Sequence, residues 1–192
     1  NKNDVDAILG LGYCQYEQKK YHEASLALKT AVEKYPLNIN AAIAYSWSLY
    51  HTQKYKDSRD QFLRTIQLNP KLADPYRGLG YSQVKLGKVD EGKLNIISAI
   101  NIFPKIVDND AFKKLIKEEK KLKGLHITFA WAYFNFALYA DALKHAEMIE
   151  VEYPDLDMLF GFIFYANKQY YRSILHLKKF TAQSPDTEEG YG

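Results

Sequence analysis

The chain has 192 residues, of which 47% are hydrophobic and 26% charged, a balance that excludes a disordered chain and is typical of a globular protein. Its 26 basic and 23 acidic residues leave a net charge of +3, which is too small to indicate a nucleic-acid partner. The single cysteine, Cys14, excludes an internal disulfide, and no apolar run reaches the roughly 20 residues of a transmembrane segment. The compartment stays open between the cytoplasm, which we favour slightly, and the periplasm.

A period of 34 residues runs along the chain. Pro36, Pro70 and Pro104 stand 34 residues apart, and Pro154 and Pro185 continue the series after an insertion and a short deletion. Small residues recur 12 and 24 positions before each proline, and a large residue recurs 25 positions before it. Two helices approach closely only where the facing side chains are small, so these positions indicate close contacts between packed segments. Asp74 and Pro75 predict an N-cap followed by the first residue of a helix.

The first copy of the repeat contains Leu11-Gly12, then Ala24 with Leu28 four residues on, then Pro36. This pattern resembles the tetratricopeptide repeat, whose signature is W-x2-L-G-x2-Y, then A-x3-F, then a proline. The resemblance implies an all-α fold: a right-handed α-solenoid of about five helix hairpins with one inserted helix between repeats three and four. The stacked helix pairs are expected near residues 5–37, 39–70, 73–104, 124–154 and 156–185. We expect a single solenoid domain over 1–192, with repeats at about 5–38, 39–72, 73–106, 123–156 and 157–187 and the insertion at 107–122.

One column of the repeat, 23 positions before each proline, is aromatic in all five copies: Tyr13, Trp47, Tyr81, Trp131 and Phe162. The resemblance implies that this column faces the concave groove of the solenoid. Small residues three positions earlier in four of the copies, Gly10, Ala44, Gly78 and Thr128, would leave room beside the rings for a ligand. The rings could instead pack sideways against one another with nothing bound.

The predicted partner-binding residues are that column together with Tyr16, Tyr50 and Arg77. Tyr16 and Tyr50 belong to a second column, 20 positions before the prolines, for which packing between repeats is the first expectation. Arg77 is expected to be solvated or stacked on a tyrosine ring. Tyr45 is expected to pack in the core between the two helices of its own repeat.

The insertion VDNDAFKKLIKEEKKLK, residues 107–123, interrupts the period. It predicts an amphipathic helix capped by Asp108 or Asp110, or an extension of the first helix of the fourth repeat. Its six lysines are expected to form a solvated face, and the alternative is a contact for an acidic partner or an anionic membrane surface.

No catalytic constellation occurs in the sequence, so we expect no enzyme, no cofactor and no metal site. His145 and His176 hold equivalent positions in adjacent repeats, but two histidines alone make a poor metal site. Cys14 lies in a column of mostly small residues and is expected to be a buried, inert thiol.

Two functions fit these features. The favoured one is a protein interaction scaffold that holds a peptide or helical segment of a partner protein in the aromatic concave groove. The alternative is a structural or self-associating spacer domain of a larger protein, as in secretion or polysaccharide-export machineries. The chain ends without a polar capping helix, and Tyr191 follows Pro185 as Tyr76 follows Pro70, so we expect a fragment of a longer protein.

Overall fold

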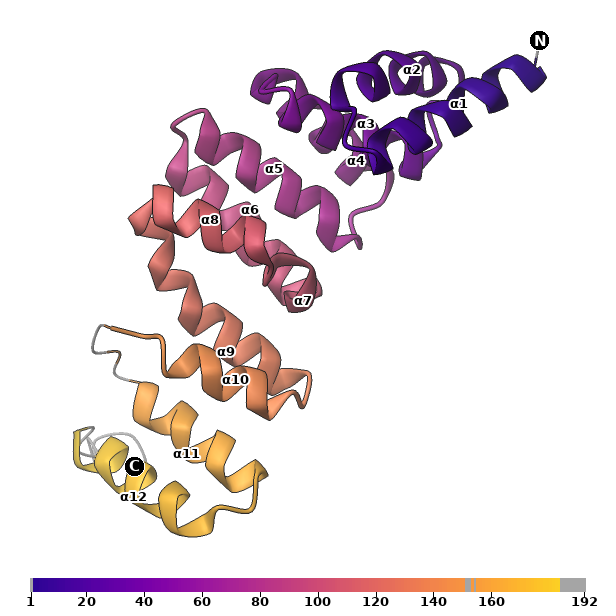
Figure 1. Cartoon of the computed structure of the whole chain (residues 1–192). Helices are drawn as coiled ribbons and strands as arrows, with labels where there is room; N and C mark the ends of the chain where they lie inside the picture. The colour runs from indigo at the N-terminus through magenta and orange to yellow at the C-terminus, as the bar shows by residue number, and fades with distance from the viewer. Residues whose placement is uncertain (1, 151–152, 154, 184–192) are drawn as a thin grey trace, which may run out of the picture. The chain divides into compact units, whose positions relative to one another are not determined.

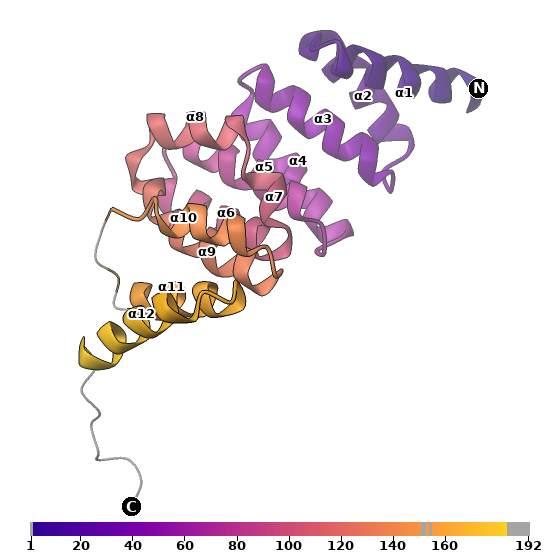
Figure 2. The ribbon, with the colours of Figure 1, turned by 60° about the horizontal axis from the view of Figure 1, so that its bottom comes forward.

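The computed structural model describes residues 2–150, 153 and 155–183, and all regular structure within them is helical. The chain divides after Leu122 into two compact units, unit 1 (1–122) and unit 2 (123–192). Both units are built from helix hairpins whose two helices lie side by side (Figures 1 and 2). This arrangement confirms the predicted all-α class with five consecutive hairpins.

Unit 1 contains three hairpins and most of the insertion. The hairpins are α1 (Lys2–Glu17) with α2 (Tyr21–Lys34), α3 (Ile39–His51) with α4 (Tyr55–Leu68), and α5 (Ala73–Lys85) with α6 (Val89–Ile102). Two further helices follow, α7 (Pro104–Val107) and α8 (Asp110–Glu118), and the division after Leu122 falls within the 3-10 helix η1 (Lys120–Leu125). Unit 2 contains α9 (His126–Asn135) with α10 (Tyr139–Ala146), and α11 (Leu156–Ala166) with α12 (Tyr170–Gln183).

The turn inside each hairpin has the same backbone conformation. One residue, always 17 positions before the repeat proline, has a positive φ: Lys19 (61°), Gln53 (61°), Gly87 (79°), Ala137 (56°) and Lys168 (59°). Only one of the five is glycine, although the left-handed region costs other residues roughly 1–2 kcal/mol. Packing of the two helices therefore holds the other four residues in this conformation.

Small residues bring the two helices of a hairpin together, as the period predicts. In the third hairpin a Cβ on Gly80 would lie 2.7 Å from the carbonyl oxygen of Gly92, and a Cβ on Gly92 would lie 2.7 Å from that of Gly80. Serine can also occupy the contact: the Ser58 hydroxyl donates to the Ser46 carbonyl oxygen at 2.9 Å, and the Ser173 hydroxyl donates to the Gly161 carbonyl oxygen at 2.9 Å.

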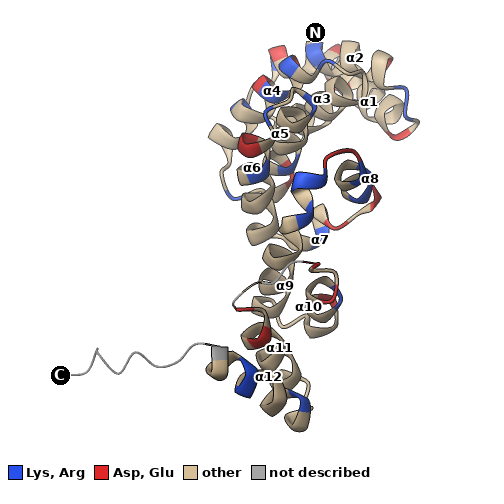
Figure 3. Ribbon diagram, turned by 90° about the vertical axis from the view of Figure 1, so that its left-hand side faces the viewer, with Lys and Arg blue, Asp and Glu red and all other residues tan. Residues whose placement is uncertain are grey.

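Unit 1 curves because its first helices come closer together than its second helices. α1 contacts α3 and α3 contacts α5, whereas α2, α4 and α6 make no contacts of similar extent with one another. The first helices therefore lie on the inner side of the curve and the second helices on the outer side. In Figure 3, α8 lies on the inner side of unit 1.

Two expected helix caps differ in the structure. α8 is a separate helix whose N-cap is Asn109, with the Asn109 side chain accepting from the Phe112 amide at 3.1 Å, and neither Asp108 nor Asp110 takes this role. α5 begins at Ala73, so Asp74 lies inside the first turn, and its carboxylate binds side chains of the inner face. The insertion buries Phe112 and Leu115 and exposes its six lysines.

Candidate functional site

An open cleft crosses the inner face of unit 1, over α1, α3 and α5. Its volume is about 250 Å3, and it is lined by Tyr13, Tyr16, Glu17, Asn40, Ile43, Ala44, Trp47, Asp74 and Arg77. Every one of these residues belongs to the first helix of a hairpin. Tyr13 and Tyr16 are half-buried and pack against the cluster formed by Ala24, Leu28 and Ala44, so their rings are held in place at the cleft wall.

Asp74 organises the floor of the cleft. Its carboxylate accepts from Trp47 Nε1 at 3.0 Å through Oδ2, and from Arg77 Nε at 2.9 Å and Arg77 Nη2 at 2.5 Å through Oδ1. The Arg77 guanidinium carbon lies 4.4 Å from the centre of the Trp47 ring, within the range of a cation–π contact. Two hydrogen-bonded donors and one stacking contact therefore fix the guanidinium in a single position.

Trp47 itself is buried, with only 5% of its surface exposed. Its ring packs edge-on against Phe62 at a centroid distance of 5.0 Å and against Tyr81 at 6.1 Å. The space beside it is filled by protein: a Cβ on Gly78 would lie 2.1 Å from Phe62 Cζ. The expectation that Gly78 leaves room for a ligand is therefore wrong, because the ring of the preceding hairpin occupies that room.

Burial raises the pKa values of the tyrosines around Arg77. The pKa of Tyr16 is raised to about 12, mainly by burial and further by the neighbouring Tyr21 and Asp74. Burial also raises the pKa values of Tyr50 and Tyr81, while the charge of Arg77 lowers them. Tyr81 is 1% exposed, and its hydroxyl has no hydrogen-bond partner among the described residues. These phenols therefore stay neutral and can act as hydrogen-bond donors up to strongly alkaline pH.

The remaining two aromatic residues of the column lie in unit 2. Trp131 on α9 is half-buried and Phe162 on α11 is 38% exposed, with their ring centroids 6.4 Å apart in an edge-on arrangement. Phe134 stacks on Phe162 at 6.2 Å. Within unit 2 the rings of adjacent hairpins therefore pack sideways and keep part of their surface exposed.

The eight predicted partner-binding residues thus fall into different settings. Within unit 1, four of them line one cleft: Tyr13, Tyr16, Trp47 and Arg77. Tyr81 is buried against Trp47, and Tyr50 lines a different pocket together with residues of α8. Sequence analysis did not select Asp74, Asn40 or Ile43 as site residues. Asp74 could have been found, because its position three residues before Arg77 on a helix allows an ion pair.

The first hairpin matches a known family. Residues 6–38 match the family model described as tetratricopeptide repeat, and the four later hairpins repeat its helix pair with the same turn. Residues 6–38 therefore form a tetratricopeptide repeat. Among curated proteins no sequence relative was found.

Several solved tetratricopeptide repeat structures are similar to this chain. The TPR domain of P58(IPK) is 20% identical, with 95% of this chain and 52% of that chain covered and a TM-score of 0.49. YrrB, described as a TPR protein with an unusual peptide-binding site, is 14% identical over 97% and 90%, with a TM-score of 0.46. A thermophilic TPR protein of Thermus thermophilus is 13% identical over 95% and 93%, with a TM-score of 0.47.

Three of the histidines form side-chain pairs within hairpins. The Nδ1 atoms of His126 and His145 lie 2.9 Å apart, and His176 Nδ1 lies 2.7 Å from Asp157 Oδ1. His145 and His176 therefore have different partners. In the described part of the chain, no group of three or more His, Cys, Asp or Glu side chains is placed to hold a metal ion. None of the helices described there is long and apolar enough to cross a membrane.

Cys14 is exposed, so the expectation of a buried thiol is wrong. The equivalent residues Ser48 and Ser82 are buried, and the Ser82 hydroxyl lies 3.0 Å from that of Ser58 on the preceding α4.

Proposed function

We propose that the cleft over α1, α3 and α5 binds a short segment of a partner protein. The tetratricopeptide repeat fold is that of a protein interaction scaffold, and the cleft is an open surface of unit 1 where aromatic and charged side chains meet. The observation that carries the proposal is the fixed Trp47–Asp74–Arg77 cluster at the floor of a cleft whose walls are tyrosines.

The tyrosine walls suit the apolar part of a ligand. Tyr13 and Tyr16 offer large, half-buried rings, and tyrosine is among the residues that contribute most to binding at interfaces. Because both rings already pack against the Ala24 cluster, little side-chain entropy is lost when a ligand covers them. Ile43 adds an aliphatic surface between them and the cleft floor.

Arg77 supplies the polar recognition. Nε and Nη2 are bound to Asp74, whereas Nη1 makes no hydrogen bond among the described residues and can donate to a backbone carbonyl of the ligand. The cleft contains two acidic residues, Glu17 and Asp74, and one basic residue, Arg77. The net negative charge of the cleft therefore disfavours an acidic segment. We infer that the ligand is a neutral or basic segment with an exposed apolar side chain.

A structural role remains the second candidate, because Trp47 and Tyr81 are buried within a single copy of unit 1. Rings that are covered by their own chain are part of its core. In that case the cleft would have no ligand, and the protein would act as a spacer or associate with itself.

Peptide selection on the purified protein separates the two candidates. Peptides selected from a random phage library should lose about tenfold or more in affinity on Tyr16→Ala or Arg77→Gln, which corresponds to the loss of an interface hot spot. They should keep their affinity on Tyr171→Ala, a control that removes a tyrosine that is 76% exposed on α12. Peptides that bind all variants equally, or a selection that yields none while the protein sediments as an assembly, would refute the proposal.

A further inference from the structure

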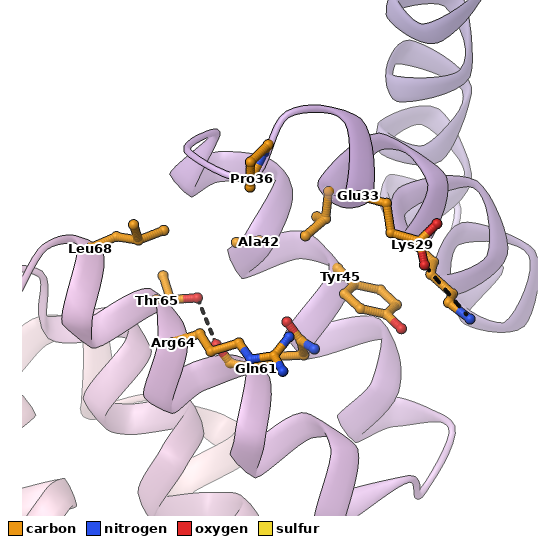
Figure 4. A pocket seen from close by; sticks show the side chains of 10 residues that line it. Lys29, Glu33, Pro36, Ala42, Tyr45, Gln61, Arg64, Thr65 and Leu68 are labelled. Carbon is orange, nitrogen blue, oxygen red and sulfur yellow. Dashed lines mark hydrogen bonds and ion pairs between the residues drawn. The ribbon is translucent and has the colours of Figure 1, made fainter.

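A second cavity lies on the opposite, outer side of unit 1, between α2 and α4. Its volume is about 290 Å3 (Figure 4), and it is lined by Lys29, Val32, Glu33, Pro36, Ala42, Tyr45, Gln61, Arg64, Thr65 and Leu68. We call it the outer notch. It contains no residue of the inner cleft, so the two can be tested separately.

The outer notch follows from the curvature of unit 1 together with one small residue. Because the first helices come together on the inner side, the second helices spread apart on the outer side and leave space between them. Ala42 lies at the base of this space. At the next junction, between the second and third hairpins, the residue at the same repeat position is Tyr76. A large ring at that position would fill the notch.

The lining of the notch also departs from the repeat. The positions of Lys29, Tyr45 and Arg64 are held by Leu63, Leu79 and Ser98 at the next junction. Helix packing therefore does not require charged or hydroxyl-bearing side chains at these three places. Tyr45 is half-buried rather than enclosed in the core, and Figure 4 shows Gln61 and Arg64 extending from α4 towards its ring.

Arg64 provides a positive charge in the notch that is not paired with a described acidic side chain. Among the described residues it forms no ion pair and no hydrogen bond, whereas Arg59 on the same helix is paired with Asp60 at 2.7 Å. The other cation, Lys29, faces Glu33 at 3.9 Å, and both side chains are more than half exposed. That pair offsets the charge of Glu33 and leaves the Arg64 guanidinium available.

The Tyr45 hydroxyl lies within the electrostatic influence of Arg64. Burial raises the pKa of Tyr45, Asp57 and Glu33 raise it further, and Arg64 lowers it. The phenol is therefore neutral and can donate a hydrogen bond, and Tyr45 lines the same cavity as Arg64. A carboxylate placed there can accept from both groups, and such charge-assisted bonds to arginine are stronger than neutral ones.

We propose that the outer notch binds an acidic side chain, Glu or Asp, of a partner protein, with an adjacent apolar residue of the same segment. The carboxylate accepts from Arg64 and from the Tyr45 hydroxyl. The apolar residue covers Val32, Pro36 and Leu68, of which Leu68 is 40% exposed. The occupant is opposite in charge to the one inferred for the inner cleft, so one partner could contact both faces only with two different segments.

The test uses a capped pentapeptide, N-acetylated and C-amidated, with Glu at its centre between two Leu residues. Binding is followed by NMR on the 15N-labelled protein, through the Arg64 side-chain Nε–H signal and the amides of α2 and α4. The wild type should bind this peptide about tenfold more tightly than a matched peptide with Gln at the centre, as expected for a charge-assisted contact.

Three variants locate the site. Arg64→Gln should remove the preference for Glu over Gln, and Ala42→Tyr should abolish binding by filling the notch. Arg59→Gln makes the same charge change on the same helix outside the notch and should leave the preference unchanged. Because Arg64 is exposed, Arg64→Gln should not affect folding. The test therefore stays valid even if Ala42→Tyr lowers the stability of the protein, and circular dichroism would detect such a loss.

Each alternative result overturns the proposal. Equal binding of the Glu and Gln peptides, equal loss in Arg59→Gln and Arg64→Gln, or no binding at all would exclude recognition of an acidic side chain at this place. A third peptide, with Gln at the centre and a free C-terminal carboxylate, is also tested. If it alone binds, the notch recognises a chain terminus and not a side chain.

Discussion

Substituting Gly78 by alanine tests how the floor of the inner cleft is held. The new Cβ would lie 2.1, 2.3 and 2.5 Å from three ring carbons of Phe62. Carbon atoms in contact are normally about 3.5–4 Å apart, so the ring would have to retreat by more than about 1 Å. It has little room to do so, because Phe62 is fully buried and its other side packs against Trp47.

Two opposing terms set the magnitude. Alanine is favoured over glycine in a helix interior by about 1 kcal/mol. Overpacking of a filled core costs about 1–3 kcal/mol, and the short distances at Gly78 place this case at the upper end. We therefore expect Gly78→Ala to lower the free energy of unfolding of unit 1 by about 2 kcal/mol.

Gly10 supplies a matched control. It holds the same repeat position in the first hairpin, and a Cβ there would have no atom within 4 Å, so Gly10→Ala should stabilise by about 0.5–1 kcal/mol. Both are measured by urea unfolding in a Trp131→Phe background, where the fluorescence of Trp47 reports on unit 1 alone. If Gly78→Ala were as stable as Gly10→Ala, the Phe62 ring could not be packed against Gly78 as described.

Two further predictions concern the cluster in the inner cleft. Asp74→Asn keeps an acceptor for Trp47 Nε1 but removes the charge that holds Arg77. We therefore expect the free energy of unfolding to fall by about 1–2 kcal/mol and acrylamide to quench Trp47 fluorescence more strongly. Unchanged quenching would show that Arg77 does not shield the ring. Burial raises the pKa of Tyr16 from 10.0 to about 12, so the folded state favours the neutral phenol while the unfolded chain ionises first. The resulting stabilisation is complete below about pH 10 and is lost as the pH rises towards about 12. The free energy of unfolding, measured in urea at about pH 9 and about pH 11, should therefore fall less in Tyr16→Phe than in the wild type. An identical fall in the variant would exclude Tyr16 as its source.

The hairpins could be predicted from the sequence because their signal is local and repeated. Small residues such as Gly80 and Gly92 must face each other at a fixed spacing, and this spacing is visible in the chain. The left-handed turn residues could not be predicted in the same way. Only Gly87 is of the type that this conformation favours, whereas Lys19 and Gln53 adopt it because the helices on both sides are packed.

The candidate site was harder to predict because a small residue does not reveal what fills the space beside it. The glycine pattern at positions 10 and 78 is identical in sequence, yet open space lies beside one and the Phe62 ring beside the other. The period placed Tyr13 and Trp47 in one column, and both residues line the same cleft. It could not show that Trp47 is covered, because this depends on Arg77 and Phe62, which come from two other helices.

The inner cleft and the outer notch have one structural cause. Bringing α1, α3 and α5 together places the tyrosine walls and Arg77 on one surface, and the same curvature spreads α2 from α4 on the other. Whether the outer space becomes a site depends on single residues, since the position of Ala42 carries Tyr76 one repeat later. Transferring Ala42, Tyr45 and Arg64 to the next junction, as Tyr76→Ala, Leu79→Tyr and Ser98→Arg, should therefore create a second site for the capped Glu peptide. If the variant with these three changes binds only one peptide per chain, the separation of the second helices that forms a site occurs only at the first junction, between α2 and α4.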